Sequence, residues 1–153
     1  MKVSVTELPF NKFVGIQRAA DAAHLLRLPA GQHYLNHLGT VHASAQLALA
    51  EASSGEFLLR HLASAEGIIP VVRRIEAKFR KPANGSIISS VTTSPQMLAE
   101  FETELSARGR VLIPIFVEIH DESGAHTLSV SVEWFIQREK SMSPGDAANR
   151  STA

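Results

Sequence analysis

Residues 36–55, NHLGTVHASAQLALAEASSG, are the stretch around which the rest of the chain is organised. Five alanines and two leucines stand within residues 43–52, so this segment favours a helix and carries few large side chains. A helix of such small residues can be packed closely on most sides. We predict that it begins near His42 or Ala43 and ends at about Ala63. Its second half is expected to be more exposed than its first, because it contains Glu56, Arg60 and His61.

Glu51 is a lone carboxylate in this segment, because no other charged residue lies between His42 and Glu51. Burying it without a partner would cost free energy or raise its pKa, so Glu51 is either a functional group or a structural one. Nine residues of helix, at about 100° and about 1.5 Å each, place Glu51 half a turn round from His42 and roughly 13 Å along the axis. One copy of the helix therefore cannot aim both groups at one small substrate. Two antiparallel copies in a dimer can.

The composition is that of one ordinary globular domain. The chain has 153 residues, of which 44% are hydrophobic and 20% are charged, which is enough for a real core. Lys+Arg and Asp+Glu both number 15, and this balance argues against nucleic-acid or anionic-membrane binding. Without cysteine there is no disulfide framework, thiolate zinc site or cysteine nucleophile. We find no membrane-spanning run and no signal-peptide pattern, so a cytoplasmic location is expected.

Two alternating patterns predict β-hairpins. Apolar and polar residues alternate over 71–80, and the PANG segment at 82–85 then leads to the β-branched run IISSVTT at 87–93. A second alternation covers 113–119 and 128–136, with DESG at 121–124 as its turn.

The other segments complete an α+β arrangement. Two short apolar runs within residues 9–28 predict a strand pair, and a loop carrying Gln32, His33 and Tyr34 then leads to the long helix. Ser94 and Pro95 predict the start of a peripheral helix that Gly109 ends. We predict a single domain over 1–138 and a disordered tail over 139–153.

This order of elements and one motif resemble the hot-dog-fold acyl-CoA thioesterases, particularly the phenylacetate-degradation and 4-hydroxybenzoyl-CoA thioesterase type. That family's pattern is Asn, a few residues, Gly-x-x-His-Gly-Gly, and then a helix with Asp or Glu nine residues after the histidine. The matching residues are Asn36, Gly39, His42, Ala43, Ser44 and Glu51. The segment AKFRKPANGS at 77–86 resembles the family's next strand, and the resemblance covers about residues 10–137. It implies an antiparallel sheet wrapped around one long central helix.

The resemblance also implies roles for these residues. The N–H of Ala43, at the positive end of the helix, would receive the charge that develops on a thioester carbonyl oxygen. Asn36 would supply a second hydrogen bond, and His42 would shape the pocket. Glu51 of the facing subunit would act as nucleophile or as general base on water. Further substrate contacts, including those to the phosphates of coenzyme A, are implied for Arg80, Lys81, Gly39 and Ser44.

Each role has a structural alternative. Glu51 could face solvent or pair with an arginine, His42 could simply cap the helix, and Asn36 could be a turn residue. The basic residues of 73–81 could form a solvated strand face. The sequence also departs from the family pattern, with His-Ala-Ser in place of His-Gly-Gly, and with Gly55 where a hydroxyl often follows the carboxylate.

From this resemblance and these residues we predict a homo-oligomer, dimer or tetramer, that hydrolyses a fatty or aromatic acyl-CoA thioester without a cofactor. The alternative is a non-catalytic acyl-CoA or lipid-binding module; a dehydratase is less well supported because its histidine and carboxylate motifs are missing. No metal is expected, since neither His37 with His42 nor His120 with His126 has a ligand spacing together with a carboxylate partner. The phosphate-loop and Gly-x-Ser-x-Gly motifs are likewise not present.

Overall fold

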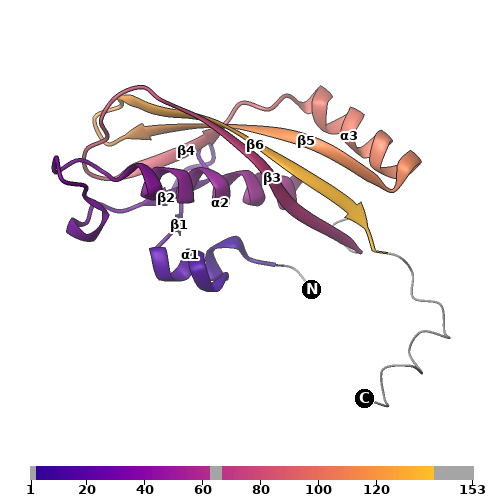
Figure 1. Cartoon of the computed structure of the whole chain (residues 1–153), viewed down its shortest axis with the longest axis horizontal. Coiled ribbons are helices and arrows are strands. Elements are labelled where there is room, and N and C mark those ends of the chain that lie inside the picture. Colours follow the sequence, from indigo (N-terminus) through magenta and orange to yellow (C-terminus); the bar gives the residue numbers. More distant parts are fainter. Residues whose placement is uncertain (1–2, 63–66, 140–153) are drawn as a thin grey trace, which may run out of the picture.

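The computed structural model describes residues 3–62 and 67–139. One six-stranded antiparallel sheet, in the order β1-β2-β4-β5-β6-β3, curves around the long helix α2 (Figure 1). Figure 1 shows α2 against one face of the sheet and α1 beyond it. The elements in chain order are a 3-10 turn η1 (Val5–Glu7), α1 (Pro9–Val14), β1 (Gln17–Arg18), β2 (Leu26–Leu28), a 3-10 turn η2 (Gln32–Tyr34), α2 (Ala43–His61), β3 (Ile68–Phe79), β4 (Ile87–Val91), α3 (Pro95–Arg108), β5 (Arg110–Asp121) and β6 (His126–Arg138).

The predicted central helix is present as α2. His42 is its N-cap, and the helix ends at His61, within two residues of the predicted end at Ala63, which lies outside the described residues. Arg60 and His61 are exposed as expected. The expectation that the second half is more exposed than the first was wrong, because Glu56 is only 4% exposed and the exposed residues of the first half, Ala43 and Ser44, stand at its start.

The second predicted hairpin is confirmed and forms the centre of the sheet. β5 and β6 pair antiparallel over almost their whole length, and the turn between them is Asp121 to Gly124. Alternate residues on both strands are buried on the side of α2, which makes the core between helix and sheet. These core residues are Val111, Ile113, Ile115, Val117, Ile119, Leu128, Val130, Val132, Trp134 and Ile136.

The first predicted hairpin was wrong in its pairing, although both strands exist. β3 pairs with β6 at one edge of the sheet, whereas β4 pairs with β2 and β5. The connecting segment is no tight turn: Ala83 is buried, and its carbonyl oxygen accepts a 2.8 Å hydrogen bond from the N–H of Val41. The segment runs from the edge strand β3 past the ends of β6 and β5 to β4, and it passes beside the start of α2. Alternation reveals strands but not their partners.

Residues 9–28 contain a helix where only strands were predicted. Pro9 is the first residue of α1, and Gly15 ends it in the left-handed region at φ 88°. A short apolar run such as FNKFV does not distinguish helix from strand by its pattern alone. The predicted strand pair is reduced to Gln17–Arg18 with Leu26–Leu28.

The peripheral helix was predicted correctly. The hydroxyl oxygen of Ser94 accepts a hydrogen bond from the N–H of Met97, and Gly109 ends α3 at φ 68°. α3 packs against β5, whose residues 110–116 extend beyond the end of β4. Within the described residues no helix is long and apolar enough to cross a membrane. The predicted disorder of the tail concerns residues that, apart from Glu139, lie outside the described range.

Candidate functional site

The loop before α2 is organised by Asn36. Its side-chain oxygen accepts hydrogen bonds from the N–H groups of Leu38 (2.9 Å) and Thr40 (3.2 Å), and its amide nitrogen donates to the Thr40 hydroxyl oxygen at 2.9 Å. Gly39 takes φ 74°, which completes the turn. Asn36 is therefore a turn residue. One of its two amide hydrogens is used within the turn, and the other has no partner among the described residues.

His42, Ala43 and Ser44 form the start of α2. The Nδ1 atom of His42 accepts a 3.0 Å hydrogen bond from the N–H of Ser44, so the imidazole caps the helix. The N–H of Ala43 has no hydrogen-bond partner in the described part of the chain, and all three residues are exposed. A free N–H at the positive end of a 19-residue helix is suited to binding a developing negative charge.

Glu51 lies two and a half turns further along α2 and is half-buried. Among the described residues its carboxylate has neither a hydrogen-bond donor nor an ion-pair partner. Burial raises the pKa of Glu51, because removal from water disfavours the charged form. The single copy does not bring Glu51 to Asn36, Gly39, His42, Ala43 and Ser44, since about 12 Å of helix separates Ala43 from Glu51.

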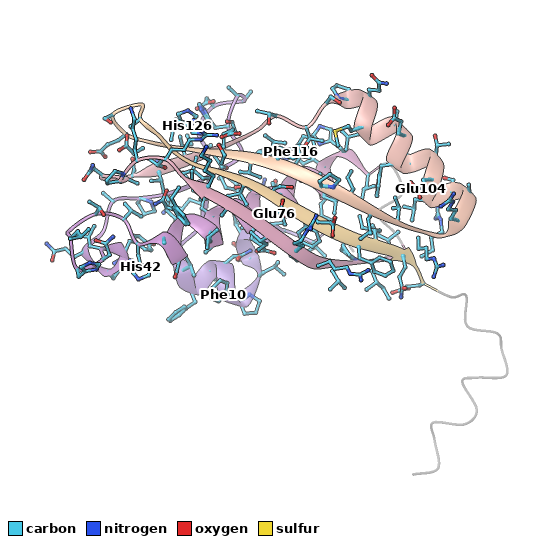
Figure 2. All side chains as sticks on the ribbon, turned by 45° about the horizontal axis from the view of Figure 1, so that its top comes forward. Phe10, His42, Glu76, Glu104, Phe116 and His126 are labelled. Atoms are coloured by element: carbon cyan, nitrogen blue, oxygen red, sulfur yellow. The ribbon has the colours of Figure 1, made fainter. Side chains whose placement is uncertain are left out.

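Glu51 lines an apolar cavity of about 430 Å³. One wall is a face of α2, and the opposite wall is the segment that precedes and includes α1, whose labelled Phe10 is visible in Figure 2. The lining residues are Val3, Val5, Leu8, Phe10, Asn11, Glu51, Ala52, Gly55, Leu58, Leu59, Ile68, Pro70 and Trp134. Glu51 is the one ionisable group in this lining, so the cavity presents a single carboxylate to an otherwise apolar space.

Trp134 fixes the floor of this cavity beside α2. Its Nε1–H donates a 3.0 Å hydrogen bond to Ser54 Oγ, and the Ser54 hydroxyl donates to the carbonyl oxygen of Glu51 at 2.7 Å. The Trp134 ring lies over Gly55, where an added Cβ would meet ring atoms at 3.5 and 3.6 Å. Sequence reasoning had not identified Trp134 or the N-terminal wall as parts of the site. The only available signal was a lone tryptophan on a strand that was predicted to be core.

Glu56 is the structural carboxylate of the same helix. Its side chain is 5% exposed and pairs with Arg18 and, at 2.8 Å, with Arg60. The structural alternative considered for Glu51 was pairing with an arginine. In the structure it is Glu56 that makes such pairs.

Lys81 lies near the start of α2 because of the crossing segment. The hydrogen bond between Val41 and Ala83 joins that segment to the loop just before Ala43. Lys81 is exposed and has no ion-pair partner in the described residues. Arg80 is held back on the sheet, where its Nε–H donates to Ser129 Oγ at 2.8 Å. Both predicted phosphate-binding residues are exposed, and they differ in that the Nε–H of Arg80 is already hydrogen-bonded.

A larger cleft of about 570 Å³ opens elsewhere and contains none of the predicted site residues. Its lining consists of Ala20, Asp21, His24, Arg27, Ser86, Ile87, Ile88, Ser90, His120, Asp121, Glu122 and Gly124. The described part of the chain contains no group of three or more His, Asp or Glu side chains arranged to hold a metal ion.

The family model described as "Domain of unknown function (DUF4442)" matches residues 15–136. No curated protein matches the chain in sequence. Among solved structures, a probable thioesterase from Pseudomonas aeruginosa is similar at 25% identity, with a TM-score of 0.75 over 88% of this chain and 91% of that one. A Bacillus halodurans protein crystallised with CoA gives a TM-score of 0.63 at 16% identity, over 83% of this chain and 74% of that one. A thioesterase from Haemophilus influenzae gives 0.62 at 15% identity, over 88% and 86%.

These similarities, together with the sheet wrapped around α2, confirm the predicted hot-dog fold.

Proposed function

The chain belongs to the DUF4442 family, and from this premise we propose that it is an acyl-CoA thioesterase acting on fatty or aromatic acyl thioesters. The observation that carries the proposal is Glu51, a carboxylate without a partner in the described residues, at the edge of an apolar cavity. The thioesterases among the similar structures, and the one that contains CoA, support the same substrate class. The motif resemblance favours the phenylacetate-degradation and 4-hydroxybenzoyl-CoA type, and we expect a cytoplasmic enzyme.

We propose that the active unit is a homodimer, or a tetramer of two such dimers, formed through the edge strand β3. Among the described residues this strand pairs only with β6, and four of its apolar side chains are 40 to 52% exposed. They are Ile69, Val71, Ile75 and Phe79. A long apolar edge strand invites pairing with another chain, and a two-fold axis at this edge would place two sheets side by side with their α2 helices antiparallel. Ala43 of one protomer then approaches Glu51 of its partner.

The reaction has two possible routes at such a site. In the general-base route, Glu51 takes a proton from water, the water oxygen bonds to the carbonyl carbon, and Ala43 N–H binds the developing oxyanion. The C–S bond then breaks, and the proton on Glu51 passes to the departing CoA thiolate. In the nucleophilic route, a Glu51 oxygen bonds to the carbonyl carbon, the thiolate leaves, and water hydrolyses the resulting anhydride. Water is the only co-reactant and Glu51 is regenerated in both routes, so the proposed reaction needs no metal and no cofactor.

The other predicted residues have supporting roles in this proposal. The second amide hydrogen of Asn36 reaches the oxyanion, while Gly39 and His42 keep the turn and the helix start in place. Ser44 borders the entrance, and Lys81, assisted by Arg80, binds the phosphates of CoA as an exposed cation near the helix start.

The decisive experiment compares the parent with Glu51→Gln on a panel of short, long and aromatic acyl-CoA thioesters. Gln keeps size and polarity but cannot act as nucleophile or base, so kcat should fall at least about 100-fold while the protein stays folded. The matched control is Glu104→Gln on the exposed helix α3, which should leave kcat unchanged. Single turnover in heavy-oxygen water identifies the nucleophilic route if the label appears on Glu51, because only in that route can water attack the Glu51 carboxyl carbon of an anhydride.

The non-catalytic acyl-CoA-binding module is the second candidate. It is favoured by the turn around Asn36, which uses most of that side chain's hydrogen-bonding capacity, and by the Ala43 methyl in place of a glycine. A parent protein that binds acyl-CoA but hydrolyses no member of the panel would support the module and reject the thioesterase.

A further inference from the structure

The cavity beside Glu51 extends along α2 in one direction only. Its lining residues from the helix are Glu51, Ala52, Gly55, Leu58 and Leu59, which follow one another on a single helix face. No residue between Asn36 and Ser44 lines it. The cavity therefore runs from Glu51 away from the helix N-terminus of its own protomer, over roughly 12 Å from Glu51 to Leu59.

This direction constrains how a thioester can lie. Its carbonyl carbon must stand within about 3 to 3.5 Å of the attacking atom near Glu51. An acyl group that fills the cavity then leaves the CoA end pointing outward. The oxyanion donor cannot be Ala43 of the same copy, which lies about 12 Å away in the opposite direction. The donor and the phosphate-binding Lys81 must come from the other copy.

We propose that Gly55 and Trp134 set the permitted length of an apolar acyl group, which lies in the cavity of the protomer that supplies Glu51. This rests on the proposed function, in which the partner supplies Ala43 and Lys81. Gly55 lies one turn, about 6 Å, beyond Glu51, and its missing side chain leaves the space beneath the Trp134 ring open.

The N-terminal segment forms the wall of the cavity opposite α2. Leu8 is 42% and Phe10 is 62% exposed, although both line the cavity, so its mouth is an apolar rim that faces solvent. Trp134 is tied to Ser54 by a hydrogen bond and lies in the core strand β6. Selectivity for acyl length should therefore depend on the space at Gly55, because the buried Trp134 ring bounds it.

The first test measures acyl selectivity in Gly55→Leu. The ratio of kcat/KM for dodecanoyl-CoA to that for butyryl-CoA should fall about tenfold or more, because a leucine side chain blocks the cavity one turn beyond Glu51. Gly55→Ala should give a smaller shift in the same direction, and its Cβ fits without strain at 3.5 Å from the Trp134 ring. Ala99→Leu on the exposed face of α3 is the matched control. An unchanged ratio in both Gly55 variants, with folding verified by thermal unfolding, overturns the inference.

Binding is measured without turnover through Trp134, which is the only tryptophan of the chain. In Glu51→Gln, dodecanoyl-CoA should change the intrinsic fluorescence, and adding Gly55→Leu should weaken that binding about tenfold or more. This readout separates two failures. A parent that hydrolyses no thioester refutes the proposed function, whereas fluorescence that does not respond to dodecanoyl-CoA refutes the acyl cavity.

The division between protomers is tested with heterodimers purified through two different tags. In a heterodimer of Glu51→Gln with Gly55→Leu, the remaining Glu51 belongs to the Gly55→Leu protomer, so the selectivity ratio should be as low as in the Gly55→Leu homodimer. When Glu51→Gln and Gly55→Leu share one protomer and the other is parental, the ratio should equal the parental value. The reverse pattern places the acyl group on the CoA-binding protomer and overturns the proposal.

Discussion

Glu51 and Glu56 stand five residues apart on α2, and in the described structure only Glu56 has charged partners. Glu56 is almost fully buried between Arg18 and Arg60, whereas Glu51 borders an apolar cavity. The two carboxylates thus separate a stabilising role from a proposed chemical role on a single helix. The same substitution at each position should have opposite effects on stability.

Glu51→Gln should stabilise the folded protein at neutral pH. Burial raises the pKa of Glu51, so between the ordinary carboxyl pKa of about 4.3 and the raised value the folded state binds more protons than the unfolded state. The parent therefore loses stability as pH rises through that window, and the Gln variant does not. The difference in Tm should be near zero at about pH 4 and grow to a plateau above the raised pKa, with each 1 kcal/mol appearing as about 2–4 °C. A difference of the opposite sign would show that Glu51 has a stabilising partner.

Glu56→Gln should destabilise the protein by about 1.5–3 kcal/mol, because two hydrogen bonds to charged donors lose their ionised acceptor. Activity per folded molecule should be unchanged. Urea unfolding and steady-state hydrolysis on one preparation measure both quantities. Loss of activity without loss of stability would assign a chemical role to Glu56.

Lys81→Ala should raise KM for acyl-CoA with little change in kcat, since phosphate contacts are equal in the ground state and the transition state. The effect should shrink with added salt because Lys81 is exposed. Arg108→Ala on α3 removes the same charge from an exposed site and serves as control. Equal KM values for the parent and Lys81→Ala at low salt would move the phosphate site elsewhere.

Val71→Lys should break the proposed dimer. The Val71 side chain is 52% exposed in one copy, so the folded monomer tolerates lysine there, whereas a charge in the paired edge does not fit. Sedimentation at micromolar concentration should show a dimer for the parent and a monomer for the variant. Leu112→Lys, on a side chain that is 47% exposed on β5, should remain dimeric. A folded parental monomer would reject the assembly and the shared site together.

The sequence was most informative where local signals act alone. Ser94 and Gly109 fixed the ends of α3, and the alanine-rich run fixed α2, because caps and propensity operate within a few residues. The partner of β3 was not predictable, because it depends on the route taken by the segment around Ala83 across the molecule. The pairing of β3 with β6, and of β2 with β4, cannot be predicted from the alternation of apolar and polar residues.

The candidate site was predictable to the same extent. The helix start and Glu51 follow from a spacing along one helix, which a motif can record. Trp134 and the lining residues of the N-terminal wall lie at least 40 residues away from Glu51 in sequence, and only the folded chain places them together. Glu56 was misjudged because one of its partners, Arg18, lies 38 residues away in β1, and only the fold brings the two together.

The wall formed by Val5, Leu8 and Phe10 has one more consequence. The family match begins at residue 15, so this wall lies outside the matched region, whereas Glu51, Gly55 and Trp134 lie inside it. The helix that carries Glu51 and the outer boundary of the cavity therefore lie in different parts of the chain, one inside and one outside the family match. Exchanging the first 14 residues alone offers a way to retune which acyl groups enter while every proposed reacting group stays where it is.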